Sequence, residues 1–120
     1  MKFRNIITAA LLISYSATCY AMDANTFYIK AAALNKKGMA AMLSSDLRPI
    51  MTEVETASKA TKAENEKAKV AGKPLYCPPP KGKFSSDQML AEFARIPAER
   101  RKIMTTRQAW REILIRRFPC

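Results

Sequence analysis

Histidine is absent from the 120 residues of the chain. Because histidine is the usual general base near neutral pH and the usual partner of serine and cysteine nucleophiles, its absence argues against the common hydrolase mechanisms. The three cysteines are too far apart for paired metal ligands, and the three glycines are isolated, which excludes a glycine-rich phosphate loop. We therefore expect no enzyme, no catalytic residue, no metal site and no cofactor. A hydrolase that works with two carboxylates is the catalytic alternative that the composition leaves open.

Signals for β-strands are also scarce. No run alternates β-branched and polar residues, and neither Asn-Gly nor Asp-Gly, the usual hairpin turns, occurs. Alanine, lysine, glutamate, methionine and leucine, which favour helices, dominate instead. We predict an all-α fold, a small single-domain bundle of about four to five helices around one core.

The first residues have the pattern of a secretion signal. Lys2 and Arg4 precede an uncharged run, residues 6–17, and Ala21 is a small residue suited to cleavage. The run is shorter than the about 20 residues that a membrane span needs. We predict a signal peptide over residues 1–21 and a mature domain over residues 22–120. A membrane anchor, a buried first helix and lipid attachment at Cys19 are the alternatives.

Cleavage after Ala21 would remove Cys19 and leave Cys77 and Cys120. In an oxidising compartment these two cysteines have only each other, so we predict one disulfide between them. It would close a loop of about 44 residues and stabilise the fold by about 4 kcal/mol in the chain-entropy model. A whole domain is stable by only about 5–15 kcal/mol, so the crosslink would matter.

Charge is strongly one-sided. The chain has 21 basic and 10 acidic residues, a formal net charge of +11, and loss of Lys2 and Arg4 with the signal leaves +9. Such an excess favours an acidic protein face, an anionic envelope polymer or nucleic acid as partner. Export makes nucleic acid the weakest of these, and we expect none. The alternative is that the charge only keeps a small protein soluble.

Caps, glycines and prolines divide the mature chain into helices. The inward stripes are typical of amphipathic helices, and we interpret Trp110 as a core residue rather than a ligand-stacking one. The predicted segments are a helix that begins after Asp23, Asn25 or Thr26, buries Phe27, Ala31 and Leu34 and ends at Gly38; a short apolar turn from Met39 to Leu43; a long helix from Asp46 to Ala71; an extended segment from Tyr76 to Lys83; a helix capped by Ser85 with Gln88 that buries Met89, Leu90, Phe93 and Ile96; a short helix after Pro97; and a last helix capped by Thr105 or Thr106, in which Trp110, Ile113 and Leu114 share a face.

The long helix changes character along its length. Its second half offers mainly alanines to a neighbour, so we predict thin packing or projection into solvent there, with fraying. Pairs four or three residues apart can add a few tenths of a kcal/mol each on its surface. The first half is predicted to bury Leu47, Ile50, Met51 and Val54, the second half Ala57, Ala60 and Ala68, and the surface pairs are Glu55–Lys59 and Glu64–Lys67.

A stiff stretch, residues 73–84, is the first candidate binding surface. Three consecutive prolines favour an extended polyproline conformation, and Cys77 would tether the segment. Little conformational entropy would then be lost on docking. The candidate partner-binding residues of this stretch are Tyr76, Lys81 and Lys83.

A basic cluster is the second candidate surface. It contains Arg100 and Arg101, and Arg107 and Arg111 follow four residues apart on one helical face. Arginine suits bidentate recognition of carboxylates or phosphates, so these four residues are candidate partner-binding residues as well. The alternative is a solvated face without a partner.

Several stretches resemble one known family. These are Lys73-Pro74-Leu75-Tyr76-Cys77-Pro78-Pro79, Ser85-Ser86-Asp87-Gln88-Met89-Leu90 and the closing Phe118-Pro119-Cys120, preceded by Ala33-Leu34-Asn35-Lys36-Lys37-Gly38 and Ser44-Ser45-Asp46-Leu47. Their order is similar to that in the Rap/Tai-type immunity proteins. By that resemblance Cys77 and Cys120 correspond to the family's disulfide, while no inhibitory residue can be carried over.

The resemblance implies a small helical protein of the periplasm. The best-known members neutralise amidase effectors of type VI secretion by blocking the effector's active site, often as dimers. We therefore expect a periplasmic, non-catalytic immunity protein that inhibits a cell-wall amidase effector, forms a homodimer and has no stable membrane anchor after cleavage. The alternatives are a periplasmic stress chaperone of the acid-protective kind and a basic binder of envelope polymers.

Overall fold

The computed structural model describes residues 21–120, and the secondary structure of that range is helical apart from one isolated β-bridge. Residues 1–20 of the predicted signal peptide, which include Cys19, lie outside the described range. The predicted all-α bundle with one disulfide is confirmed. The elements are α1 (Ala24–Lys37), the 3-10 helix η1 (Gly38–Leu43), α2 (Leu47–Val70), α3 (Ser86–Ala94), α4 (Ala98–Lys102) and α5 (Thr106–Arg117).

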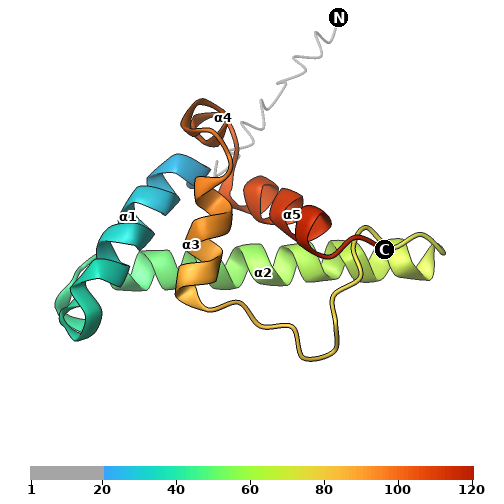
Figure 1. The fold of residues 1–120 in the computed structure, drawn as a ribbon, viewed down its shortest axis with the longest axis horizontal. Helices are drawn as coiled ribbons and strands as arrows, with labels where there is room; N and C mark the ends of the chain where they lie inside the picture. The colour runs from blue at the N-terminus through green and yellow to red at the C-terminus, as the bar shows by residue number, and fades with distance from the viewer. Residues whose placement is uncertain (1–20) are drawn as a thin grey trace, which may run out of the picture.

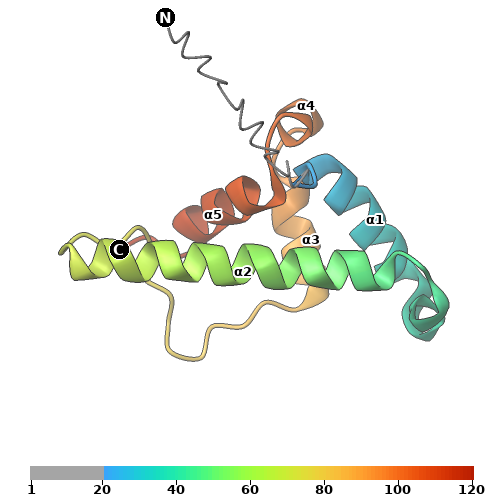
Figure 2. The ribbon, with the colours of Figure 1, turned by 180° about the vertical axis from the view of Figure 1, so that it is seen from behind.

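The long helix α2 forms one layer of the molecule, and α1, α3 and α5 lie across it in a second layer (Figure 1). Seen from behind, α2 lies in front of the other helices along its whole length (Figure 2). The short helix α4 lies on the side of the second layer that is remote from α2. This arrangement leaves η1 at one end of the molecule and the loop between α2 and α3 on its lower edge.

Three of the helices begin at the predicted capping residues. The Asp23 carboxylate accepts a hydrogen bond from the Thr26 amide at 2.9 Å. The Ser85 and Thr105 hydroxyls each accept one from the amide three residues later at 3.1 Å, and the glutamine side-chain oxygen there accepts a hydrogen bond from the cap's own amide. These reciprocal capping boxes satisfy amide groups that a helix start would otherwise leave without a partner.

The core lies between the two layers. Phe27, Phe93, Ile96 and Ile113 are at most 1% exposed, and the Phe27 and Phe93 ring centroids lie 5.0 Å apart. Trp110 is half-buried and stacks on Phe93 at 6.3 Å, so it packs on the core as predicted. One continuous cluster of buried side chains therefore joins α1, α2, α3 and α5.

The inner face of α2 differs from the prediction. Met51 is 59% exposed, because Ile50 and Val54 already occupy the inward stripe and position 51 lies one step around the helix from it. In the second half the fully buried positions are Ala57, Thr61 and Asn65. The helix continues without a break to Val70 and α5 packs on α2, so of the two predicted alternatives the structure has packing on a neighbour rather than projection into solvent.

Within residues 21–120, no helix has both the length and the apolar composition needed to cross a bilayer.

Candidate functional site

The side chain of Asn65 fixes the start of the loop that follows α2. Its amide nitrogen donates to the Tyr76 carbonyl at 3.0 Å, and its oxygen accepts from the amides of Leu75 and Tyr76 at 2.8 and 3.2 Å. Asn65 is 8% exposed, so these bonds are shielded from water. Asparagine in the middle of a helix of alanine, lysine and glutamate has poor intrinsic propensity, and this was the sequence signal that could have revealed the clamp.

The disulfide and an aromatic cluster hold the rest of the loop. Cys77 and Cys120 are bonded, with their Cα atoms 4.9 Å apart, and the Cys77 amide donates to the Phe118 carbonyl at 2.8 Å. At the far end, the Phe84 ring meets Trp110 and Phe118 edge-on, with centroids 5.2 and 5.6 Å apart. Residues 77–84, here called the proline loop, are therefore tethered to the body at both ends.

Between its ends the proline loop stands away from α2. An open cavity of about 440 Å³ lies under it, lined by aromatic side chains such as Tyr76 and Trp110 and by polar residues of α2. The Gly82 amide donates to the Pro79 carbonyl at 3.0 Å and closes a turn at the tip. A Cβ atom on Gly82 would lie 3.1 Å from Pro79 Cγ, so this tight turn favours glycine.

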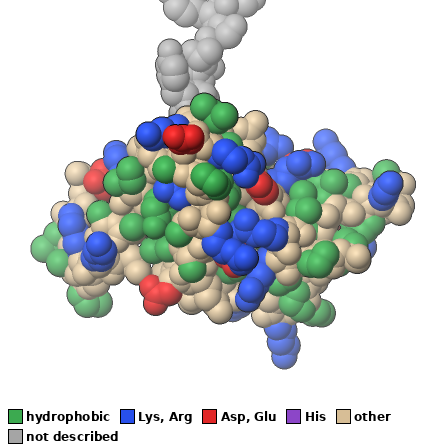
Figure 3. All heavy atoms as spheres, turned by 45° about the horizontal axis from the view of Figure 1, so that its top comes forward, with side chains coloured by type: hydrophobic (Ala, Val, Ile, Leu, Met, Phe, Trp, Pro, Cys, Tyr) green, Lys and Arg blue, Asp and Glu red, His purple; other side chains and the backbone are tan. Residues whose placement is uncertain are grey.

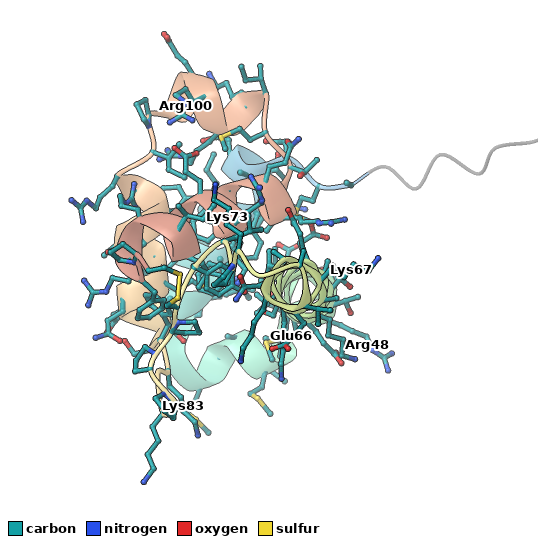
Figure 4. All side chains as sticks on the ribbon, turned by 90° about the vertical axis from the view of Figure 1, so that its right-hand side faces the viewer. Arg48, Glu66, Lys67, Lys73, Lys83 and Arg100 are labelled. Atoms are coloured by element: carbon teal, nitrogen blue, oxygen red, sulfur yellow. A yellow bond between two sulfur atoms is a disulfide. The ribbon has the colours of Figure 1, made fainter. Side chains whose placement is uncertain are left out.

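The loop candidates separate into one buried residue and two exposed ones. Tyr76 is 6% exposed, and burial raises the pKa of its hydroxyl. It therefore supports the loop from below and offers no surface to a partner. Lys81 and Lys83 are exposed and form no ion pair within the described residues, and Lys83 points away from the body at the lower end of the loop (Figure 4).

The exposed arginine candidates are paired within the chain. Arg111 Nε lies 2.7 Å from a Glu64 oxygen, and Arg107 approaches the same carboxylate at 3.7 Å. Glu64 therefore pairs across the layers with α5, and the predicted Glu64–Lys67 pair is not formed, whereas Glu55–Lys59 is, at 2.7 Å. The arginine pair on α5 thus recognises a carboxylate, as the residue type predicts, but the carboxylate belongs to α2 of the same chain.

The other two arginine candidates lie on α4 and connect it to α5 and to the end of α3. Arg100 makes a bidentate pair with Glu112, with distances of 3.0 and 2.9 Å, which raises the pKa of the Arg100 guanidinium. Arg101 is only 8% exposed and donates to the carbonyls of Phe93 and Ile96 at the end of α3. Arg101 therefore offers no surface for a partner, because its guanidinium satisfies carbonyl groups left free at a helix end.

Glu92 on α3 is a polar centre that sequence reasoning missed. It is 7% exposed, and Arg116 Nη2 lies 2.6 Å from one of its oxygens, with Arg95 and Arg117 at 3.6 and 3.9 Å from the other. The hydrogen bond from Arg116 lowers the pKa of Glu92 in spite of its burial. Its sequence context, Leu90-Ala91-Glu92-Phe93-Ala94-Arg95, gives no sign that this carboxylate is enclosed.

The described residues hold no cluster of three or more Asp, Glu or Cys side chains arranged to bind a metal ion. Among the charged side chains on the face shown in Figure 3, basic ones are more prominent than acidic ones. Of the predicted site, the part that is exposed and whose charges form no ion pair within the described residues is thus the proline loop with Lys81 and Lys83. The arginines serve mainly to join helices.

Comparison with protein-family models, with curated proteins and with solved structures gave no match for this chain.

Proposed function

We propose that this chain is an exported, non-catalytic inhibitor of the immunity type, which blocks the active site of a cell-wall amidase effector delivered by type VI secretion. The observation that carries the proposal is the proline loop, which is tethered at both ends, stands clear of the body and presents two exposed lysines. Its Cys-Pro start and the aromatic-Pro-Cys end of the chain are also the elements on which the resemblance to Rap/Tai-type proteins depends.

Tethering favours tight docking. A flexible segment loses conformational entropy when it binds, at a cost of about 0.5–1.5 kcal/mol for each immobilised side chain. In the proline loop, three prolines fix backbone angles, Gly82 closes a turn and the disulfide holds the base. Much of the ordering cost is thus met on folding, which is what a protein that inserts a loop into an enzyme cleft requires.

Charge indicates the kind of cleft. The proline loop contains no acidic residue, and Lys81 and Lys83 have no carboxylate partner within the described residues. Complementary potentials speed up encounter and reject wrong partners. We therefore expect the surface of the amidase around its active site to be acidic.

The test is inhibition of a purified amidase. The chain is recovered from the periplasm of an expressing host and titrated against the cell-wall hydrolases encoded beside its gene, with hydrolysis of isolated cell wall as readout. The double substitution Lys81→Glu and Lys83→Glu is expected to weaken inhibition at least about tenfold, because two attractive charges become repulsive. Lys67→Glu with Lys69→Glu, on exposed positions of α2, is the control and should change inhibition less than about twofold.

Failure of the wild-type protein to bind or inhibit any of these hydrolases would overturn the proposal. A protein that instead prevented client aggregation at low pH would favour the acid-protective chaperone. Affinity for envelope polymers that falls steeply with salt would favour the polymer binder. The oligomeric state in solution, measured by light scattering, tests the homodimer that the resemblance implies.

A further inference from the structure

Three large apolar side chains project from η1. Met39, Met42 and Leu43 are 87%, 72% and 92% exposed, and here they are called the apolar tip. Only Ala41 of η1 faces the core. The segment protrudes beyond α1 and the start of α2 at one end of the molecule, in the front view and from behind (Figure 1, Figure 2). Such side chains are normally covered in a folded protein, so their grouping at a protruding end indicates a contact surface.

Basic residues flank the apolar tip in the sequence. Lys36, Lys37 and Arg48 are exposed and form no ion pair within the described residues. The one acidic residue close in sequence, Asp46, is 3.5 Å from Lys30 and is neutralised by it. Figure 3 shows hydrophobic and basic side chains next to each other at this end. The tip is thus apolar at its centre, with mainly basic residues beside it and one exposed carboxylate, Asp87, next to Asn35 at 2.8 Å.

The apolar surface continues into a groove beside the tip. An open depression of about 240 Å³ lies between α1, α2 and α3, and its lining is almost entirely aliphatic. Gly38 and Ala41 of η1 line the groove on the side of the tip, and Met51, Met89 and Leu90 line it farther in. The exposed Met51, which departs from the sequence prediction, belongs to this surface.

Charge and size decide between the occupants of such a surface. A second copy of the chain would bring another set of basic residues against this one, and Met39, Met42 and Leu43 by themselves cannot supply the roughly 800 Å² that each partner contributes to a stable protein interface. An anionic bilayer meets both requirements, because its phosphates match the lysines and its acyl chains accept methionine and leucine side chains. Flexible methionines also adapt to a fluid partner.

We propose that the apolar tip docks this protein reversibly on an anionic lipid bilayer, with Met39, Met42 and Leu43 among the acyl chains and Lys36, Lys37 and Arg48 at the phosphates. The proline loop lies on another part of the molecule (Figure 1). The inference does not depend on the proposed inhibition of an amidase.

The test is co-sedimentation of the protein with vesicles of phosphatidylglycerol and phosphatidylcholine, compared with phosphatidylcholine alone. Wild type is expected to bind the anionic vesicles and to be released by salt. Replacing Met39, Met42 and Leu43 by serine should weaken binding about tenfold or more, since three apolar insertions are lost. Lys36→Glu with Lys37→Glu should weaken it similarly through repulsion.

Matched controls exist for both variants. Val70→Ser with Ile103→Ser removes two side chains that are 90% and 85% exposed elsewhere, and Lys67→Glu with Lys69→Glu makes the same charge change on α2. A contribution from residues 1–20 would affect all variants alike. Equal binding to neutral and anionic vesicles, or equal losses in the tip and control variants, would overturn the proposal.

Unchanged helical circular dichroism confirms that the variants fold, and unchanged amidase inhibition in lipid-free solution separates this surface from the proline loop.

Discussion

Asn65 connects the longest helix to the loop that follows it through one carboxamide group. Both of its polar atoms are buried and both are satisfied by backbone groups of Leu75 and Tyr76. A buried polar group stabilises a fold only when its hydrogen bonds are made, and loss of one partner leaves the others without compensation. The position of the proline loop therefore depends on this side chain as well as on the disulfide.

Asn65→Ala is expected to lower the free energy of unfolding by about 1–3 kcal/mol, because two backbone amides and one carbonyl lose their partner. Hydrogen exchange at the amides of Leu75 and Tyr76 should become faster, whereas exchange at the amides of α2 should change less. Asn35→Ala is the control, since Asn35 donates to Asp87 at the exposed surface and its loss should cost under about 0.5 kcal/mol. Equal effects of the two substitutions would show that Asn65 is no clamp.

Glu92 is the second residue whose surroundings set its role. Three arginines approach its carboxylate, and the pKa of Glu92 lies below its ordinary value of 4.5. The unfolded chain therefore binds a proton more readily than the folded one in this pH range. The contribution of Glu92 to stability is complete above about pH 5 and is lost as the pH falls through the lowered pKa.

Glu92→Gln should cost about 1–3 kcal/mol near neutral pH, because a charge-assisted hydrogen bond to Arg116 is lost. The stability of the variant should also change less than that of wild type between about pH 6 and pH 3. Urea unfolding at several pH values measures both effects. Glu99→Gln, at an exposed position without an ion pair in the described range, should leave the pH dependence unaltered. A variant with the wild-type slope would contradict the role assigned to Glu92.

At the scale of elements, capping boxes set where α3 and α5 begin. Each start has a hydroxyl on the cap and a glutamine three residues later, and both hydrogen bonds form in each case. The start of α5 also pairs with the start of α1, since the Ala24 amide donates to the Met104 carbonyl at 2.8 Å and Thr106 donates to Met22 at 3.1 Å. The cap at Thr105 thus organises a junction of two helices.

Thr105→Ala is expected to lower the unfolding free energy by about 1 kcal/mol, because the Gln108 amide loses its acceptor at the first turn of α5. Thermal unfolding monitored by circular dichroism measures the change. Thr52→Ala, at an exposed position within α2, serves as the control and should be neutral or slightly stabilising, since alanine favours a helix interior more than threonine does. A neutral Thr105→Ala would mean that the cap is dispensable.

At the scale of the whole molecule, the disulfide joins the last residue to the proline loop across a sequence separation of 43 residues. The segment closed by the disulfide contains α3, α4 and α5. The disulfide therefore restricts the conformations of this segment even in the unfolded chain. The chain-entropy model assigns about 4 kcal/mol to a loop of this length. For a small domain this is a considerable share of its stability.

Replacement of Cys77 and Cys120 by serine should therefore lower the unfolding free energy by about 2–4 kcal/mol, and reduction of wild type should lower it equally. Urea unfolding with and without dithiothreitol measures both. The double-serine variant is insensitive to dithiothreitol if no other disulfide contributes. A stability unchanged by reduction would show that the helices alone fix the fold.

Much of the architecture follows from local signals. The caps at Asp23, Ser85 and Thr105, the stop at Gly38 and the pairing of Cys77 with Cys120 are fixed by chemistry that acts over a few residues or by the exclusion of other partners, and the structure has each of them. The exposure of Lys81 and Lys83 follows in the same way from a proline-rich segment that cannot join a helix. These features needed no knowledge of how the helices pack.

The packing of α2 against α5 decided the rest, because it brings together residues that are distant in the sequence. It directs Arg107 and Arg111 to Glu64 instead of a partner, and it is accompanied by the enclosure of Glu92 by Arg116 and of Asn65 by Leu75 and Tyr76. A periodic pattern shows which side of a helix is apolar, but not which carboxylate a neighbouring helix brings to it. The helix boundaries and the crosslink were therefore determined by the sequence itself, whereas the division of the basic residues into structural and exposed ones was determined by the tertiary fold.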